Sequence, residues 1–225
     1  MQNSHHEVPE AMIFDLDGTL FQTETLLVKA YHKLFDTLRS EGLFEGPTPP
    51  EERMLSCLGM VMETIWDKVM PDASIEAHER ANELLSRYEL EGLAAGDGKL
   101  YDEVEVTLKE LRSRGIKLFV ASNGQEPYVR GVAAAKGITD LFVDLYSAGE
   151  YQTTTKVDLV AHLLNKYQLK SAWMVGDRSS DVEAGLENGL TVVACDYATF
   201  RSAGELEGAH IRIKEFKEIL NYIEQ

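Results

Sequence analysis

Four aspartates form two close pairs along the chain, and carboxylates at such spacing can hold a metal ion. Asp15 and Asp17 lie in the segment DLDGTL, and Gly18 directly after them allows a tight turn that brings both side chains into one pocket. Asp177 and Asp181 are four residues apart, so they share one face if a helix begins between them. Clustered carboxylates repel one another unless a cation lies among them, and an oxygen-rich site with few protein ligands suits Mg²⁺. The sequence therefore predicts Mg²⁺ as a cofactor.

Three further residues, Ser122, Asn123 and Lys156, are of the types that bind a phosphate group. The hydroxyl and amide groups can donate hydrogen bonds to phosphate oxygens, and the lysine ammonium supplies a point charge. With Mg²⁺ and a lysine beside it, an aspartate can attack phosphorus in line and become an aspartyl-phosphate. A second aspartate on the same turn can protonate the leaving oxygen and later activate water. These residues therefore predict hydrolysis of a phosphate ester.

This chemistry requires that the residues meet, and the predicted secondary structure brings them to one edge of a sheet. A short apolar run over 11–15 predicts a buried strand that ends at the first aspartate pair. Further strands, which alternate with helices, are predicted over 116–121, 141–146, 172–175 and 190–195. This alternation predicts an α/β fold with a Rossmann-like open parallel sheet. The carboxyl ends of such strands form the ligand site, and the candidate segments fall there.

Residues 22–96 interrupt this alternation. A helical period begins at Thr23, and two more helices are predicted over 51–70 and 74–91, between segments rich in Gly and Pro. We therefore predict two domains. A core domain is formed by 1–21 and 97–225, and an inserted, all-helical cap domain is formed by 22–96.

The amino-acid composition restricts the kinds of partner that the protein can bind. The 225 residues carry 22 Lys+Arg against 38 Asp+Glu, and this net charge of −16 disfavours binding to nucleic acid or an anionic membrane. No stretch approaches the ~18–20 apolar residues of a membrane span. Two cysteines, Cys57 and Cys195, provide no disulfide framework, so a reducing, cytoplasmic location is expected. The expected partner is a small phosphorylated metabolite, with no nucleic acid and no membrane.

The motifs also resemble those of a known family. The segment 15–20 resembles the nucleophile motif of the haloacid dehalogenase superfamily, and 122–123, Lys156 and 176–181 resemble its other three motifs in the same order. The insert over 22–96 is similar to the helical cap of the phosphoglycolate phosphatase-like branch. The resemblance thus covers nearly the whole chain.

This resemblance implies a role for each motif residue. Asp15 would be the nucleophile, and Asp17 would be the general acid and base. The phosphate group would be bound by Ser122, Asn123 and Lys156. Magnesium would be held by Asp15, Asp177 and the backbone carbonyl of Asp17. Asp181 would support the metal or Lys156, and Gly18 and Thr19 would be further supporting residues.

Within this resemblance, substrate selectivity is expected from the cap. Sugar-phosphate mutases of the family have a cap glycine that is followed three positions later by an arginine for a second phosphate. Here Gly59 is followed by Met60, Val61 and Met62, which argues against mutase activity. We expect Gly59, Met60 and Met62 to contact the leaving group through apolar surface. Dehalogenases lack the second aspartate, whereas Asp17 is present.

The most direct interpretation is a Mg²⁺-dependent phosphatase. The same site could instead hydrolyse inorganic pyrophosphate, or the chain could be a catalytically idle binding module of the same fold. An idle copy usually loses the nucleophile or a metal aspartate, and all of them are present here. The sequence leaves phosphoglycolate, nucleotides and sugar phosphates open as substrates, and it leaves a monomer or a homodimer open.

Overall fold

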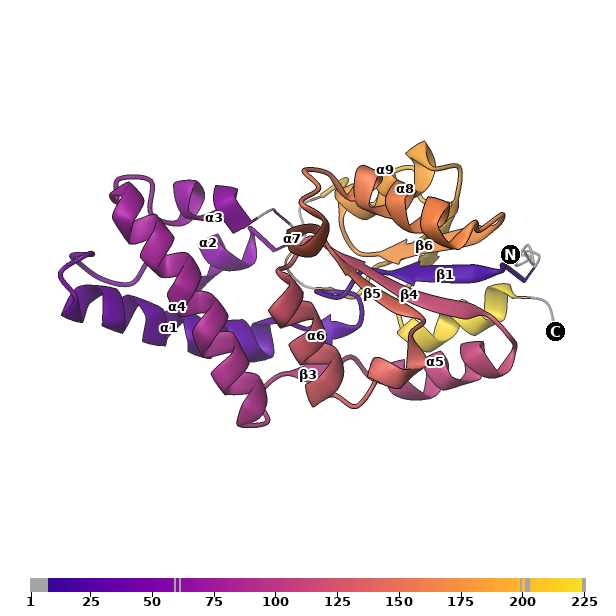
Figure 1. Cartoon of the computed structure of the whole chain (residues 1–225), viewed down its shortest axis with the longest axis horizontal. Coiled ribbons are helices and arrows are strands. Elements are labelled where there is room, and N and C mark those ends of the chain that lie inside the picture. The colour runs from indigo at the N-terminus through magenta and orange to yellow at the C-terminus, as the bar shows by residue number, and fades with distance from the viewer. Residues whose placement is uncertain (1–7, 59, 61, 199, 201–202, 224–225) are drawn as a thin grey trace.

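The computed structural model describes residues 8–58, 60, 62–198, 200 and 203–223, and a six-stranded parallel sheet organises the larger part of it (Figure 1). The order of the strands across the sheet is β5-β4-β1-β6-β7-β8, and every neighbouring pair is parallel. The strands are β1 (Ala11–Phe14), β4 (Lys117–Ser122), β5 (Asp144–Ser147), β6 (Ala172–Gly176), β7 (Thr191–Cys195) and β8 (Ile211–Ile213). This arrangement confirms the predicted α/β fold class.

Strand β1 lies inside the sheet, between β4 and β6. All four of its residues are fully buried, which explains why the strand is continuously apolar rather than alternating. Met12 and Phe14 contribute to the core on one face of the sheet, and Ala11 and Ile13 contribute to the core on the other. The loop that follows β1 therefore begins in the middle of the carboxyl edge.

Helices cover both faces of the sheet. One face packs against α5 (Val104–Ser113), α6 (Glu126–Ala135) and the 3₁₀ helix η2 (Phe216–Tyr222). The other face packs against α8 (Lys156–Tyr167) and α9 (Ser179–Glu187). Two shorter elements, η1 (Thr139–Leu141) and α7 (Ala148–Tyr151), flank β5.

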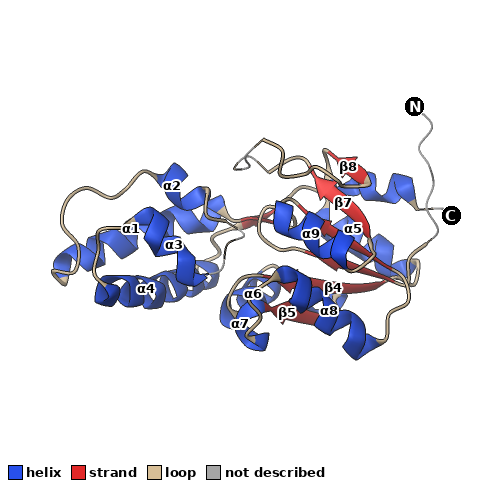
Figure 2. Cartoon of the chain, turned by 90° about the horizontal axis from the view of Figure 1, so that it is seen from above, coloured by secondary structure: helices blue, strands red, loops and turns tan. Residues whose placement is uncertain are grey.

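The remaining helices lie together beside the sheet-containing part (Figure 2). They are α1 (Glu24–Ser40), α2 (Glu51–Leu55), α3 (Met62–Val69) and α4 (Ile75–Ala94), and they enclose an apolar core of their own around Trp66. We call these four helices the cap. A two-stranded antiparallel ribbon connects the cap to the sheet, because β2 (Phe21–Gln22) leads into α1 and pairs with β3 (Lys99–Leu100), which follows α4.

Several predicted elements differ from the observed ones. The single helix predicted over 51–70 was wrong: the chain forms α2 and α3, and turns with i→i−3 hydrogen bonds at Cys57 and Leu58 end the first of them. The spacing of the apolar residues predicted one continuous helix across Gly59, although glycine is a poor helix former. The helical pattern over 215–223 predicts a closing α-helix, but the structure forms the 3₁₀ helix η2 there. The short strands β2, β3 and β8 were not predicted, because each depends on pairing with a distant segment.

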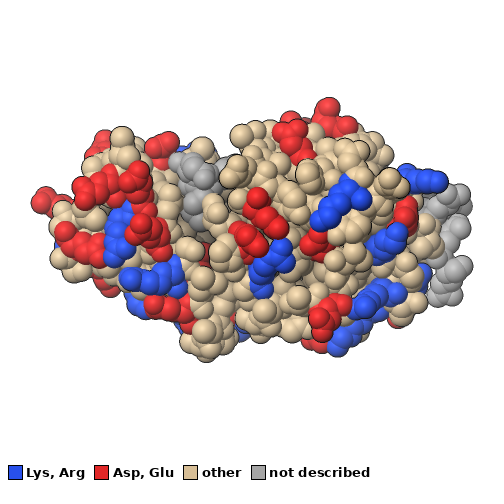
Figure 3. Space-filling view, in the orientation of Figure 1, with Lys and Arg blue, Asp and Glu red and all other residues tan. Residues whose placement is uncertain are grey.

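The surface carries mixed charge. On the face shown in Figure 3, acidic and basic side chains are interspersed over both the cap and the sheet-containing part. Within the described ranges, no helix combines the length and apolarity that crossing a bilayer requires.

Candidate active site

A buried lysine joins two aspartates at the carboxyl edge of the sheet. Asp15 directly follows β1, and its backbone N–H donates to the carbonyl of Val175 at 2.9 Å, so the parallel pairing with β6 continues to this residue. Nζ of Lys156, the first residue of α8, lies 2.7 Å from Oδ1 of Asp15 and 2.6 Å from Oδ1 of Asp181. All three side chains are almost completely buried. The sheet therefore holds a charged cluster where water has little access.

Asp177 adds a third carboxylate to this cluster. One oxygen each from Asp15, Asp177 and Asp181 lie within 4.8 Å of one another. Both oxygens of Asp181 already have partners, since Oδ2 accepts from the backbone N–H of Arg178 at 2.9 Å. Oδ2 of Asp15, in contrast, is buried and has no hydrogen-bond partner. One lysine does not neutralise three carboxylates, so the donor set fits a divalent cation such as Mg²⁺.

The pKa shifts within the cluster also indicate a site that fits a cation. Burial, followed by the charges of Asp181 and Asp17, raises the pKa of Asp15 to about 7, although Lys156 opposes this shift. Burial and the neighbouring Asp15 raise the pKa of Asp177 well above its ordinary value. Burial alone would lower the pKa of Lys156, but the two carboxylates it contacts raise it above the usual range. The lysine is thus protonated, but its single positive charge does not neutralise the three carboxylates around it.

Gly18 shapes the turn that follows β1. Its φ of +76° lies in the left-handed region, and a Cβ at this position would lie 2.4 Å from Oδ2 of Asp177. Thr19, the next residue, is fully buried, and its hydroxyl donates to Oδ1 of Asp177 at 3.1 Å. Gly18 and Thr19 therefore both lie against the third carboxylate.

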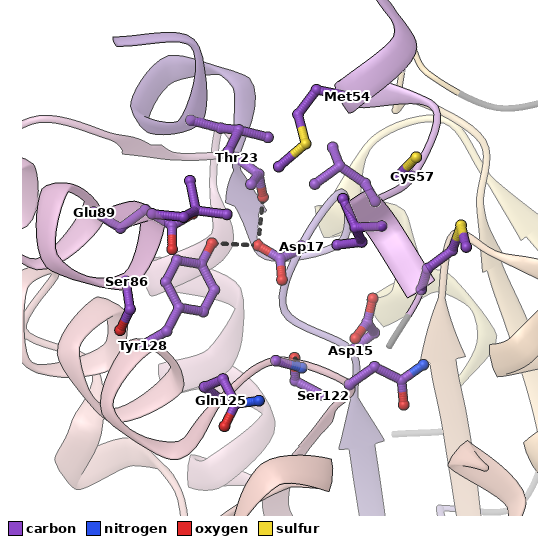
Figure 4. Close-up of a pocket in the computed structure, with 17 residues that line it drawn as sticks. Asp15, Asp17, Thr23, Met54, Cys57, Ser86, Glu89, Ser122, Gln125 and Tyr128 are labelled. Atoms are coloured by element: carbon purple, nitrogen blue, oxygen red, sulfur yellow. Dashed lines mark hydrogen bonds between the residues drawn. The ribbon is translucent and has the colours of Figure 1, made fainter. Parts of the chain in front are cut away.

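Asp17 faces the cap side of the same turn and is held by two hydroxyl groups (Figure 4). Thr23 and Tyr128 each donate to Oδ1 of Asp17 at 2.5 Å. Burial raises the pKa of Asp17, and these two hydrogen bonds only partly offset the shift. A raised pKa keeps a larger fraction of a carboxyl group protonated at a given pH, as a proton donor requires.

Asp15 and Asp17 open into a pocket between the sheet and the cap, with about 650 Å³ of space that includes an opening to solvent. Ser122 at the end of β4, Asn123 after it, and Met60 from the cap line this pocket. The Ser122 hydroxyl accepts from the backbone N–H of Gly124 at 3.1 Å. Of the other residues predicted to contact the leaving group, Gly59 and the side chain of Met62 lie outside the described part of the chain.

Some lining residues were not predicted from the sequence. Tyr128 lies on α6, and Glu89 and Ser86 lie on α4. The signal for Glu89 was present: it lies four residues after Leu85 and four before Leu93, inside the buried apolar stripe of α4. The remaining lining residues are Thr23, Leu27, Met54, Cys57, Leu58, Ile65, Leu85, Gly124 and Gln125.

The sequence and the fold are similar to those of known proteins. The family described as haloacid dehalogenase-like hydrolase matches residues 12–195. A phosphoglycolate phosphatase from Aquifex aeolicus is 30% identical over 182 residues, which cover 79% of this chain and 80% of that protein. A crystal structure described as a predicted phosphoglycolate phosphatase from Haemophilus somnus 129PT superposes with a TM-score of 0.82 at 21% identity, covering 95% of this chain and 97% of that one.

A further relative is the tyrosine-protein kinase PtkA of Mycobacterium tuberculosis, which is 28% identical over 206 residues. This match covers 89% of the chain but only 66% of the length of the kinase. The family match spans all the segments that form the acidic cluster and its lysine. The chain therefore belongs to the haloacid dehalogenase-like hydrolase family, on its phosphoglycolate phosphatase-like branch.

Proposed function

We propose that the protein is a Mg²⁺-dependent phosphatase that hydrolyses a small phosphomonoester through an aspartyl-phosphate at Asp15. One observation carries this proposal: Lys156 holds one oxygen of Asp15, while the other oxygen is buried without a partner beside the pocket that also contains Asp17. An oriented carboxylate with one free oxygen is the group that in-line attack on phosphorus requires.

Two carboxylates of the cluster, Asp15 and Asp177, are the proposed metal ligands. Asp15 and Asp177 would hold Mg²⁺ together with the backbone carbonyl of Asp17, as the family resemblance implies. Asp181 would act indirectly, because its oxygens bind Lys156 and the backbone of Arg178. When bound, Mg²⁺ would neutralise the carboxylates and a phosphate oxygen and would lower the barrier to attack.

In the first step, Oδ2 of Asp15 attacks phosphorus, and the bond between phosphorus and the leaving oxygen breaks. Asp17 donates its proton to that oxygen, so the leaving group departs as an alcohol. Its raised pKa supports this role. Ser122, Asn123 and Lys156 would bind the other phosphate oxygens.

In the second step, the ionised Asp17 takes a proton from water, and the water oxygen attacks phosphorus. The bond between phosphorus and Asp15 breaks, inorganic phosphate forms, and both aspartates return to their initial states. The cap would cover the pocket during this cycle and exclude bulk water. We accordingly propose that 22–96 acts as a cap domain on a core formed by 1–21 and 97–225.

The pocket favours a phosphomonoester over pyrophosphate. Its described lining includes no lysine or arginine, so no basic side chain there would hold a second phosphate group. We do not propose kinase activity for this chain, because the similarity to PtkA spans only 66% of that protein.

Both cysteines, Cys57 and Cys195, are buried and free, which supports a reducing, cytoplasmic location.

Phosphate release from p-nitrophenyl phosphate tests the proposed function. The proposal expects turnover with Mg²⁺, loss of turnover after chelation and dialysis, and recovery when Mg²⁺ is added back. Full turnover after exhaustive chelation would overturn the metal assignment. The absence of turnover under every metal condition would favour the idle binding module.

A further inference from the structure

The pocket between the sheet and the cap contains one carboxyl group that the proposed chemistry does not use. Glu89 lies on α4 and lines the pocket, and only 6% of its surface is exposed. The cap residues that line the same pocket are mainly apolar, such as Leu85 and Met54. Figure 4 shows Glu89 at the edge of this pocket, beside Tyr128. A carboxyl group in such surroundings is costly to bury unless it has a partner.

Within the described part of the chain, Glu89 has no hydrogen bond and no ion pair. Burial, and then the charge of Asp17, raises its pKa to about 8. In Figure 4, Glu89 and Tyr128 lie on the same side of Asp17. Glu89 lines the pocket and is 6% exposed, so little of its side chain reaches the bulk solvent. The missing partner of Glu89 would therefore be a group on the substrate.

The charges of the pocket restrict what this group can be. The described lining residues include the carboxyl groups of Asp15, Asp17 and Glu89 but no basic side chain. A leaving group that ends in a carboxylate or a second phosphate would bring another negative charge beside these three carboxyl groups, with no basic side chain among the described lining residues to neutralise it. A leaving group that ends in an ammonium would instead favour the ionised form of Glu89, so the carboxyl group would release its proton and form an ion pair with the ammonium.

We propose that Glu89 determines substrate specificity by binding the distal end of the leaving group, and that it selects phosphate esters of amino alcohols over those with an anionic terminus. This inference rests on the proposed phosphatase function and specifies its substrate class. An ammonium is preferred, a hydroxyl is intermediate because it can still donate to the carboxylate, and a carboxylate is rejected.

A matched set of substrates tests the inference. Phosphoethanolamine, 2-hydroxyethyl phosphate and phosphoglycolate each have a two-carbon leaving group, which ends in an ammonium, a hydroxyl or a carboxylate respectively. The same three termini on a three-carbon chain extend the reach toward Glu89. We expect kcat/KM to fall in that order, with at least about a tenfold difference between the ammonium and the carboxylate substrates.

The Glu89→Gln variant cannot ionise but keeps the shape of the side chain. It should reduce the preference for ammonium over carboxylate to within about threefold, mainly through a higher KM for the ammonium substrate. The matched control is Glu91→Gln, the same change on the same helix. Glu91 lies outside the pocket and pairs with Lys33 at 2.5 Å on the surface, so this variant should retain the parental preference.

The outcomes separate the inference from the function on which it rests. If the parent hydrolyses p-nitrophenyl phosphate but shows no preference among the three termini at either length, the specificity inference is wrong and the phosphatase stands. If Glu89→Gln changes all substrates by the same factor and alters the melting temperature, Glu89 has a structural role only. If the parent hydrolyses nothing, the proposed function itself fails.

Discussion

Nζ of Lys156 lies 2.7 Å from Oδ1 of Asp15, and both side chains are almost completely buried. Lys156 also contacts Asp181, and Asp177 lies in the same cluster, so one ammonium faces three carboxylates. The cluster therefore binds protons or a cation more strongly in the folded protein than in the unfolded chain. Its charge state links the stability of the fold to pH and to Mg²⁺.

The first prediction concerns this linkage. The pKa of Asp15 is about 7 in the folded protein and 3.8 in its ordinary state, so the folded form binds the proton more tightly. This contribution to stability is complete below the lower value and is lost as the pH rises through the higher one. The metal-free protein should therefore melt at a lower temperature as the pH rises from about 5 to about 8, and Mg²⁺ should restore stability most at the upper end.

Thermal unfolding with and without Mg²⁺ measures this effect. The Asp15→Asn variant serves as the control, because it removes one of the crowded charges and should weaken the dependence on pH. If Mg²⁺ raised the melting temperature equally at about pH 5 and at about pH 8, the result would argue against a carboxylate cluster as the metal site.

The second prediction separates two effects of glycine at positive φ. Gly18 and Gly42 have φ values of +76° and +74°, but only at Gly18 would a Cβ meet Asp177, at 2.4 Å. Gly42→Ala should cost about 1–2 kcal/mol of stability and leave turnover intact. Gly18→Ala should also displace Asp177 and reduce kcat/KM by at least about 100-fold.

Melting temperatures and phosphate release from p-nitrophenyl phosphate, measured on both variants, test the comparison. Equal activity of the two variants would show that the close approach of Gly18 to Asp177 does not matter for turnover.

The third prediction concerns the hydroxyl group of Tyr128. It donates to Oδ1 of Asp17 at 2.5 Å, and this hydrogen bond lowers the pKa of Asp17 against the effect of burial. Tyr128→Phe should raise that pKa further. The limb of the pH profile of kcat that requires ionised Asp17 should then move to higher pH, and kcat should fall by about tenfold.

Tyr88→Phe is the matched control, because the Tyr88 hydroxyl contacts Thr37 within the cap, at 2.8 Å. Its pH profile should match that of the parent. An unchanged profile for Tyr128→Phe would remove the tyrosine from the positioning of Asp17.

The sequence predicted the parts of the site that depend on local pattern. The apolar run that ends at Asp15 predicted a strand with its carboxyl end at the site, and α/β alternation predicted that Lys156 and Asp177 lie at the same edge; the structure brings these residues together. Tyr128 and Glu89 could not be placed in the same way. The apolar stripe of α4 indicates that Glu89 is buried, but its approach to the site depends on how the cap packs on the sheet. The approach of Tyr128 to Asp17 depends on how α6 packs beside the turn after β1.

The same reason explains the errors in the secondary structure. The ribbon that pairs Phe21 with Leu100 forms between segments separated by the whole cap, and each of its strands has only two residues. No run of that length carries a strand signal. The prediction of one long helix over 51–70 was wrong because the spacing of apolar residues does not show where a helix is interrupted.

The most direct test of the account is phosphate release by the Asp15→Asn variant. The amide has the shape of the carboxylate but cannot attack phosphorus, so turnover of p-nitrophenyl phosphate in the presence of Mg²⁺ should fall by at least about 1,000-fold, or ~4 kcal/mol in the barrier, while the protein stays folded. Activity within about tenfold of the parent, measured on a folded variant, would contradict the assignment of Asp15 as the nucleophile.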